Sequence, residues 1–180
     1  MTSPPAGGID PQRRSGGDTF DDAERSDIPT TDAADDVTRV TELLGRTPSG
    51  AFEVVVRGEG GSPAVIANAP FLHDGTPMPT RYWLVDPALR EAVSRLESNG
   101  GVRQAEASVP AELVAEAHDR YRSERDALIP DDVTGPRPSG GVGGTRQGVK
   151  CLHAHLAWWL TGADDPVGAW TAQRIGLHPS

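Results

Sequence analysis

Two short segments rich in β-branched residues, separated by a glycine-rich turn, constrain the fold of this chain more than any other feature. The segments are Phe52–Arg57 and Ala64–Asn68, and such a pair predicts a β-hairpin. A third strand is predicted at Arg81–Val85 and a fourth at Gly101–Ala107. Strands come first and helices follow, without regular alternation. This order predicts an α+β fold with a small, mainly antiparallel sheet of three to four strands.

Apolar residues at helical spacing predict four to five helices packed against this sheet. The expected spans are Val37–Leu44, a helix from Asp86-Pro87 to Gly100, Pro110–Leu128, Gly148–Thr161 and Asp165–Ile175. The predicted N-caps include Asp36, Asp86 and Asp165. In the third helix the residues expected to face inward are Leu113, Ala117, Tyr121 and Leu128. The fourth is apolar over most of its circumference, which predicts a central place in the fold.

The acidic charge is concentrated near the N-terminus. Residues 1–36 carry nine acidic side chains against three arginines, which accounts for −6 of the net charge of −9. Their few sizeable apolar residues cannot bury enough surface to offset an ordering entropy of about 1–2 kcal/mol per residue. We therefore predict a disordered acidic tail over residues 1–36 and a single α+β domain over residues 37–180.

Composition excludes several classes of function. A net-negative chain lacks the basic surface that nucleic acid binding requires. No apolar run reaches the roughly 18 residues of a membrane span, and the N-terminus lacks the features of a signal peptide. A single cysteine, Cys151, cannot form an internal disulfide, which fits a reducing compartment. We therefore expect a cytoplasmic protein with neither nucleic acid nor a membrane as its partner.

Residues 140–155 carry the chemistry that folding alone explains least. Five glycines precede a predicted helix, and the only lysine of the chain, Lys150, lies at its start. A helix N-terminus attracts anions through its free N–H groups and its dipole. Gly144, Arg146 and Lys150 are therefore candidate ligands for a small anion such as phosphate. The segment lacks the Walker pattern, because Val149 stands where that pattern has its lysine. The alternative interpretation is a flexible linker that runs into a helix.

Cys151, His153 and His155 follow in the same predicted helix. Cys151 and His155, four positions apart, share a face, whereas His153 lies about 160° away from Cys151. The Cys151–His155 pair is the candidate catalytic pair, with a thiolate nucleophile activated by His155 and the helix N-terminus. It is alternatively half of a divalent metal site, such as a zinc site with His73 or His118 as a further ligand. A third interpretation is a buried cysteine beside a hydrogen-bonded histidine.

Residues 69–84 form the second unusual segment. Pro77 and Pro79 stiffen a loop that delivers three polar residues to the start of a strand, so Thr80, Arg81 and Tyr82 are candidate ligand-binding residues. His73-Asp74 provides either a base or an anion ligand, or Asp74-Gly75 is simply a turn, which we favour. His118 lies among charged residues and is expected on a solvated helix face.

These segments resemble a bacterial family catalogued only as a domain of unknown function, number 501. The resemblance rests on Pro-Phe-Leu-His-Asp-Gly-Thr-Pro-Met-Pro-Thr-Arg-Tyr-Trp-Leu, on Gly-Val-Lys-Cys-Leu-His-Ala-His-Leu-Ala, and on the later Asp-Pro-Val-Gly. It extends from about Val37 to Ile175 and implies a housekeeping role in the bacterial cytoplasm. It assigns no catalytic residue. Asp165 departs from the pattern, because similar chains often have asparagine there, and both residues cap helices.

The sequence thus predicts a polar pocket built from two parts. One is the glycine-rich segment of residues 140–155, with Arg146, Lys150, Cys151 and His155, and the other is the loop of residues 73–82. This pocket would bind a small anionic ligand and act on it as a hydrolase or transferase through a Cys/His site. The alternative is a non-catalytic interaction or regulatory protein, in which the cysteine and histidines are structural.

Overall fold

The computed structural model describes residues 30–177, and side chains from residue 34 onward. The expectation that residues 1–29 lack regular structure lies outside the described residues. Helix α1 spans Thr30–Leu44, so residues 30–36 are helical and do not belong to the tail, and Asp36 lies inside the helix and not at its N-cap. The helix extends this far because Arg57 of the hairpin binds the Asp36 carboxylate at 2.7 Å, while Val40 one turn later is fully buried.

The sheet is antiparallel throughout and has the strand order β1-β2-β3. Its strands are β1 (Phe52–Arg57), β2 (Pro63–Asn68) and β3 (Tyr82–Leu84). The central strand β2 is buried along its whole length. Gly60 and Gly61 in the turn have φ of 67° and 79°, a left-handed conformation that glycine adopts without a steric cost. The predicted hairpin and third strand are confirmed, and so is the α+β class.

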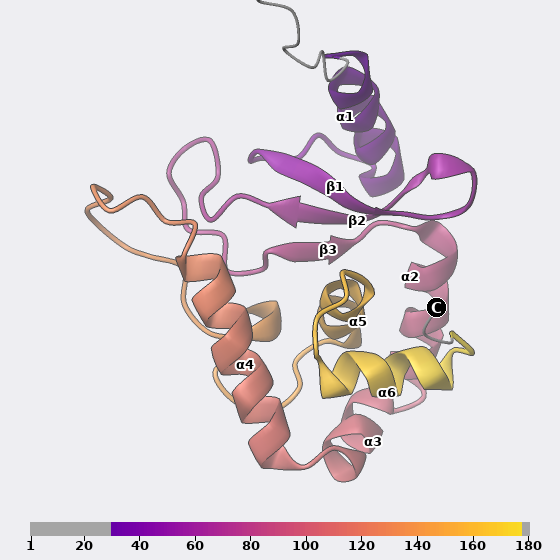
Figure 1. The fold of residues 1–180 in the computed structure, drawn as a ribbon. Helices are drawn as coiled ribbons and strands as arrows, with labels where there is room; N and C mark the ends of the chain where they lie inside the picture. Colours follow the sequence, from indigo (N-terminus) through magenta and orange to yellow (C-terminus); the bar gives the residue numbers. More distant parts are fainter. Residues whose placement is uncertain (1–29, 178–180) are drawn as a thin grey trace, which may run out of the picture. The chain divides into compact units, whose positions relative to one another are not determined.

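Six α-helices accompany these three strands within residues 30–177. After the sheet come α2 (Pro87–Ser98), α3 (Gly101–Ser108), α4 (Ala111–Asp126), α5 (Leu152–Leu160) and α6 (Pro166–Arg174). Helix α1 lies on one face of the sheet, and α5 lies on the other, surrounded by the remaining helices (Figure 1). None of the helices between residues 30 and 177 has the length and apolar character needed to cross a bilayer.

Each face of β2 belongs to its own apolar core. Ile66 packs with Val40 and Val85 on the α1 side, whereas Val65 and Ala67 join the larger core around α5. This division follows from the alternation of side chains along a strand. Helix α5 is almost entirely buried, as its apolar circumference predicted. Helix α5 therefore packs against both β3 and α2, while Cys151 and His153 at its start are partly exposed.

The fourth predicted strand is wrong, because Gly101–Ser108 is helix α3. Gly100, with φ of 81°, turns the chain directly from α2 into α3. Gly101 and Ala105, four residues apart, form the buried stripe of α3. A short segment of small and polar residues contains too little periodicity to separate strand from helix.

Helix α4 faces the core with a different stripe from the predicted one. Ala117 and Tyr121 are buried as expected, but Leu113 and Leu128 are 41% and 46% exposed. His118 and Arg125 take inward positions instead, and both are buried. The Arg125 guanidinium donates to the carbonyl oxygens of Gly140 at 2.8 Å, Pro138 at 3.3 Å and Pro79 at 3.3 Å. A buried arginine thus ties both unusual segments to α4.

Candidate functional site

Helix α5 begins later than predicted, and this determines which side chains meet. The expected helix began at Gly148, but Gly148 has a φ of 62° and the helix starts at Leu152. Cys151 is the N-cap residue, with extended backbone at φ −158° and ψ 122°. The helical spacing that paired Cys151 with His155 therefore does not apply, because Cys151 is outside the helix.

Cys151 meets His153 at the start of α5. The Cys151 Sγ lies 3.6 Å from His153 Nδ1. The same Nδ1 lies 3.3 Å from Oε1 of Glu97, a residue of α2. Glu97 Oε1 also accepts a hydrogen bond of 2.6 Å from the backbone N–H of Leu152. The ligand atoms of Glu97, Cys151 and His153 all lie within 4.8 Å of one another, so the three side chains form one cluster.

The contacts of His153 shift its pKa. Its Nε2 lies 3.2 Å from the carbonyl oxygen of Arg90 and 3.2 Å from Ser94 Oγ. The neighbouring Cys151 raises the pKa of His153 above its usual value; burial acts against this shift, and the Glu97 carboxylate adds to it. A cation at this imidazole is therefore favoured by its surroundings.

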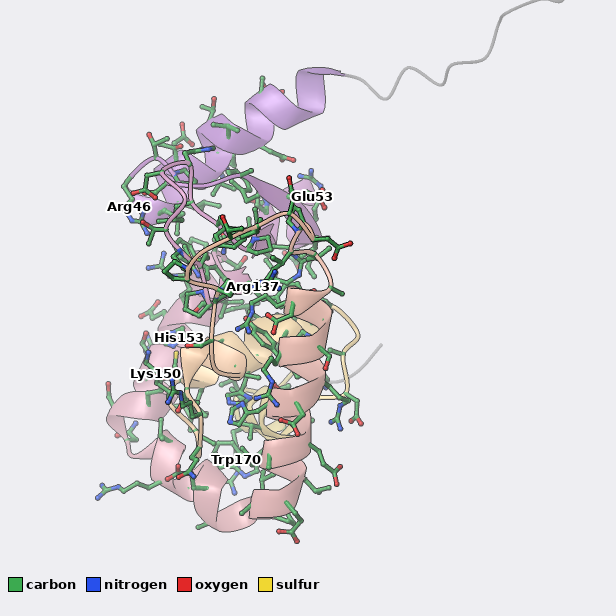
Figure 2. All side chains as sticks on the ribbon, turned by 90° about the vertical axis from the view of Figure 1, so that its left-hand side faces the viewer. Arg46, Glu53, Arg137, Lys150, His153 and Trp170 are labelled. Carbon is green, nitrogen blue, oxygen red and sulfur yellow. The ribbon has the colours of Figure 1, made fainter. Side chains whose placement is uncertain are left out.

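A pocket of about 290 Å³ opens beside this cluster. It is lined by Leu44, Thr80, Tyr82, Trp83, Leu84, Arg90, Ser94, Cys151, His153 and Ala154. The two unusual segments of the sequence therefore come together here. Thr80 and Tyr82 line the same pocket as Cys151 and His153. His153 and Lys150 project from the start of α5 on the same side of the view in Figure 2. Lys150 is exposed and does not line the pocket.

Arg81 points elsewhere, although its neighbours line the pocket. Its guanidinium donates to the Asn68 carbonyl at 3.1 Å and to the Tyr82 hydroxyl at 3.2 Å. It also lies 3.7 Å from Glu124, whose carboxylate accepts hydrogen bonds from the Tyr82 hydroxyl and from Trp158 Nε1. Arg81 therefore holds β3 to α4 and is not available to a ligand in this pocket.

His155 is engaged inside the core. Its Nδ1 lies 2.7 Å from the Asp165 carboxylate, and both side chains are fully buried. Asp165 also caps α6, accepting from the backbone N–H groups of Val167 at 2.9 Å and Gly168 at 3.0 Å. His155 Nε2 is buried without a hydrogen-bond partner in the described part of the chain. The side-chain partner of His155 is thus Asp165, while the side-chain partner of Cys151 is His153.

His118 is not on a solvated face, because it is 4% exposed. Its Nδ1 accepts from the Val142 N–H at 3.0 Å, and its Nε2 lies 2.9 Å from the Gly148 carbonyl oxygen. The ring is therefore neutral with its hydrogen on Nε2, and burial lowers its pKa. The absence of a side chain at Gly141 allows this close packing, since a Cβ there would overlap the His118 ring.

His73 lies in an exposed turn. Its backbone N–H donates to the Ser49 carbonyl at 3.0 Å, and the next residue, Asp74, accepts from the Thr76 N–H at 2.9 Å. This hydrogen bond from Thr76 lowers the pKa of Asp74. With Gly75 at a φ of 82°, the turn interpretation of Asp74-Gly75 is confirmed. The group of metal-type ligands found within the described residues contains Glu97, Cys151 and His153, and not His73 or His155.

Several backbone N–H groups of the glycine-rich segment already donate hydrogen bonds to acceptors within the chain. Glu106 Oε1 accepts from the Val149 N–H at 2.9 Å, as Glu97 does from Leu152. An anion at these amides would compete with two carboxylates of the chain. Gly144 packs against Pro79, and the exposed Arg146 borders a separate pocket of about 350 Å³ between α3 and α4. Neither residue lines the pocket beside Cys151.

The fold and this cluster define an α+β protein with a thiol, an imidazole and a carboxylate gathered at the start of a buried helix. The chain belongs to a family described as "Protein of unknown function (DUF501)", whose model matches residues 54–173. The matched range contains all three side chains of the cluster and confirms the resemblance found in the sequence. No curated protein and no solved structure matches the chain.

Glu97 is the member of the cluster that sequence reasoning missed. Arg90, Ser94 and Glu97 recur at helical spacing along α2, and all three contact the start of α5 or line its pocket. These residues each follow one of Leu89, Val93 and Leu96, so their stripe lies about 100° from the apolar stripe, a position that is normally solvated. Only the packing of α2 against α5 distinguishes this stripe from an ordinary surface.

Proposed function

We propose that this protein binds a small molecule bearing an oxyanion, a phosphate or a carboxylate group, in the pocket beside Cys151 and His153. The observation that carries the proposal is the Arg90 guanidinium. Arg90 lines this pocket, and within the described residues its guanidinium has a hydrogen bond of 3.1 Å to the Leu43 carbonyl but no carboxylate partner. A guanidinium with free N–H groups binds phosphate and carboxylate oxygens in a planar, bidentate manner.

The rest of the pocket fits such a ligand. Thr80 and Ser94 bring hydroxyl groups that donate to oxyanion oxygens, while Leu44, Trp83 and Leu84 supply apolar walls. A volume of about 290 Å³ lies at the lower end of the range for ligand pockets. The ligand is therefore a small metabolite and not an extended chain.

Cys151 and His153 give the pocket a reactive side, as expected of a hydrolase or transferase. The 3.6 Å contact places an imidazole nitrogen within reach of the thiol proton. The Arg90 carbonyl holds the other ring nitrogen and so orients the imidazole. A nucleophile, a base and a group that orients the base are the parts used in covalent acyl transfer.

A saturation experiment tests the binding. Inorganic phosphate, pyrophosphate and acetate are titrated into the metal-free full chain, and the melting temperature is followed, because a ligand that binds only the folded state raises it. A charge-assisted hydrogen bond contributes about 1.5–3 kcal/mol, so Arg90→Gln is expected to weaken binding about 10- to 100-fold. Comparison of phosphate with acetate identifies the preferred oxyanion.

The matched control is Arg103→Gln, which removes an exposed arginine of α3 that does not line the pocket. It should leave the affinity unchanged. If no oxyanion raises the melting temperature, or if Arg90→Gln and the native chain respond alike, the proposal is wrong.

A non-catalytic interaction protein is the second candidate function. Two observations favour it: His118 and His155 are bound inside the fold, and an apolar groove of about 540 Å³ lined by Trp159 and Trp170 runs along α6. Under this interpretation Cys151 would react with alkylating reagents only after denaturation. Rapid alkylation of the native chain would favour the ligand-binding site.

A further inference from the structure

The cluster at the start of α5 combines a thiol, an imidazole nitrogen and a carboxylate oxygen. These are the three ligand types that zinc accepts in proteins. Zinc bonds of about 2.3 Å to sulfur and about 2.0–2.2 Å to nitrogen and oxygen, at tetrahedral angles, separate S from N by about 3.6 Å and N from O by about 3.4 Å. The observed separations are 3.6 Å from Cys151 Sγ to His153 Nδ1 and 3.3 Å from Nδ1 to Glu97 Oε1. Two of the three separations thus match a zinc site, and the third, from Cys151 Sγ to the Glu97 carboxylate, is under 4.8 Å.

The hydrogen bonds of His153 also suit a metal ligand. Its Nε2 faces the Arg90 carbonyl oxygen, which only accepts, so Nε2 carries the ring hydrogen. In the neutral ring Nδ1 then presents a lone pair to the Glu97 oxygen 3.3 Å away, and two lone pairs repel each other. A cation between these atoms, either a proton on Nδ1 or a metal ion, removes the repulsion. A ring nitrogen bound to a backbone carbonyl is also the usual second contact of a metal-bound histidine.

The remaining ligands are held in place by the backbone. Glu97 Oε1 is fixed by the Leu152 N–H at 2.6 Å, and Cys151 is fixed by its extended conformation as the N-cap of α5. Ser94 Oγ supports the far side of the imidazole at 3.2 Å. Preformed ligands of this kind lower the cost of ordering a metal site.

We propose that Glu97, Cys151 and His153 bind a divalent metal ion of the zinc type, with its fourth position open toward the pocket. Three protein ligands and one open position are typical of catalytic zinc sites, whereas structural sites have four protein ligands. The oxyanion of the proposed ligand would take this fourth position. Cys151 would then serve as a metal ligand and not as the nucleophile, so this inference goes beyond the proposed function and does not depend on it.

Cobalt(II) is the probe for the test, because it occupies zinc sites and absorbs visible light. The full chain, without an affinity tag, is freed of metal with a chelator under reducing conditions and titrated with Co²⁺. We expect one ion per chain, a thiolate-to-cobalt charge-transfer band, intense visible bands of tetrahedral cobalt, and loss of these bands when Zn²⁺ is added. Because Cys151 is the only cysteine, the charge-transfer band reports on this residue alone.

Variants identify the ligands. Cys151→Ser should abolish the charge-transfer band, and His153→Ala and Glu97→Gln should each weaken cobalt binding more than about tenfold, since even outer contacts of metal sites cost 10–100-fold. Glutamine retains an oxygen that accepts the Leu152 N–H. The matched controls are His73→Ala and Glu91→Gln, both at exposed residues outside the cluster, which should bind cobalt as the native chain does.

A measurement on the native chain guards against variants that fail to fold. Zinc should slow the alkylation of Cys151 in a saturable way, while magnesium, which prefers oxygen ligands, should not. A missing charge-transfer band, bands that persist unchanged in the Glu97 and His153 variants, or a thiol equally reactive with and without zinc would each overturn the proposal. Oxyanion binding by the metal-free chain is measured separately, so failure of one proposal is distinguishable from failure of the other.

Discussion

At the scale of single residues, the position of Cys151 relative to the end of a helix decides which histidine it meets. Helical spacing favoured His155, four residues away. As the N-cap, Cys151 instead reaches His153, and His155 turns inward to Asp165. Helix ends are predicted from sequence only to within about 2–4 residues, and the predicted start at Gly148 lies four residues before Leu152. At a site built on the first turn, an error of this size changes the partner of a reactive side chain.

The raised pKa of His153 makes a contribution to stability that depends on pH. A group whose pKa is higher in the folded than in the unfolded state stabilises the fold fully below its unfolded pKa, about 6.5 for histidine. This stabilisation is lost as the pH rises through the folded pKa. We therefore expect the free energy of unfolding of the metal-free chain to exceed that of His153→Gln by an amount that shrinks as the pH rises from 6 to 8.5. Urea unfolding at several pH values measures it.

The corresponding control for this prediction is His73→Gln. His73 is exposed, and its described hydrogen bond is made by the backbone, so this replacement should have little effect at any pH. A difference between the native chain and His153→Gln that stays constant from pH 6 to 8.5 would contradict a raised pKa.

At the scale of elements, α4 organises the glycine-rich segment. His118 binds Val142 and Gly148, and Arg125 binds carbonyl oxygens from Pro138 to Gly140. A hydrophobicity pattern counts histidine and arginine as polar, so it predicts Leu113 and Leu128 beside Ala117 and Tyr121 on the buried stripe of α4, where the structure has His118 and Arg125. Gly141 is needed here for close packing against His118 of α4, and Gly140, Gly143, Gly144 and Gly148 have positive φ, so these glycines are explained without a bound phosphate.

Replacement of His118 by alanine should therefore destabilise the fold strongly. It leaves the buried Val142 N–H without its acceptor, which costs about 1–3 kcal/mol, and it removes a buried ring as well. We expect the free energy of unfolding to fall by about 2–5 kcal/mol at pH 7.5. Because burial lowers the pKa of His118, this stabilisation is present above about pH 6.5 and declines at lower pH, opposite in sign to that of His153.

Chemical denaturation of His118→Ala at pH 7.5 and pH 5 tests both parts of this prediction. His73→Ala is the matched exposed control and should change the free energy of unfolding by less than about 0.5 kcal/mol. Equal losses for the two variants would show that His118 does not hold the glycine-rich segment.

At the scale of the whole molecule, local patterns predicted most elements, with α3 as the exception, but not how the elements pack against one another. The hairpin, α2 and α6 follow from β-branched runs and from Asp-Pro helix starts, and both aspartates cap their helices as expected. The contact of Glu97 with Cys151 depends on how α2 packs against α5, and no local pattern encodes it. The start of the first helix is a similar case. It is predicted at Val37 and lies at Thr30, because the acidic residues of α1 look like a tail in the sequence, while Val40 packs against Ile66 of the sheet.

The last prediction concerns whether α1 is part of the folded core. Val40 is fully buried against Ile66 and Val85, whereas Val37 on the same helix is 47% exposed. Both replacements by alanine change the helix propensity equally, so their difference isolates burial. Val40→Ala should lower the free energy of unfolding by about 1–3 kcal/mol, and Val37→Ala by less than about 0.5 kcal/mol. Leu156→Ala, in the core on the other side of the sheet, should cost about 2–5 kcal/mol. If both valine variants unfolded like the native chain while Leu156→Ala did not, α1 would belong to the acidic tail and the sheet would have one covered face.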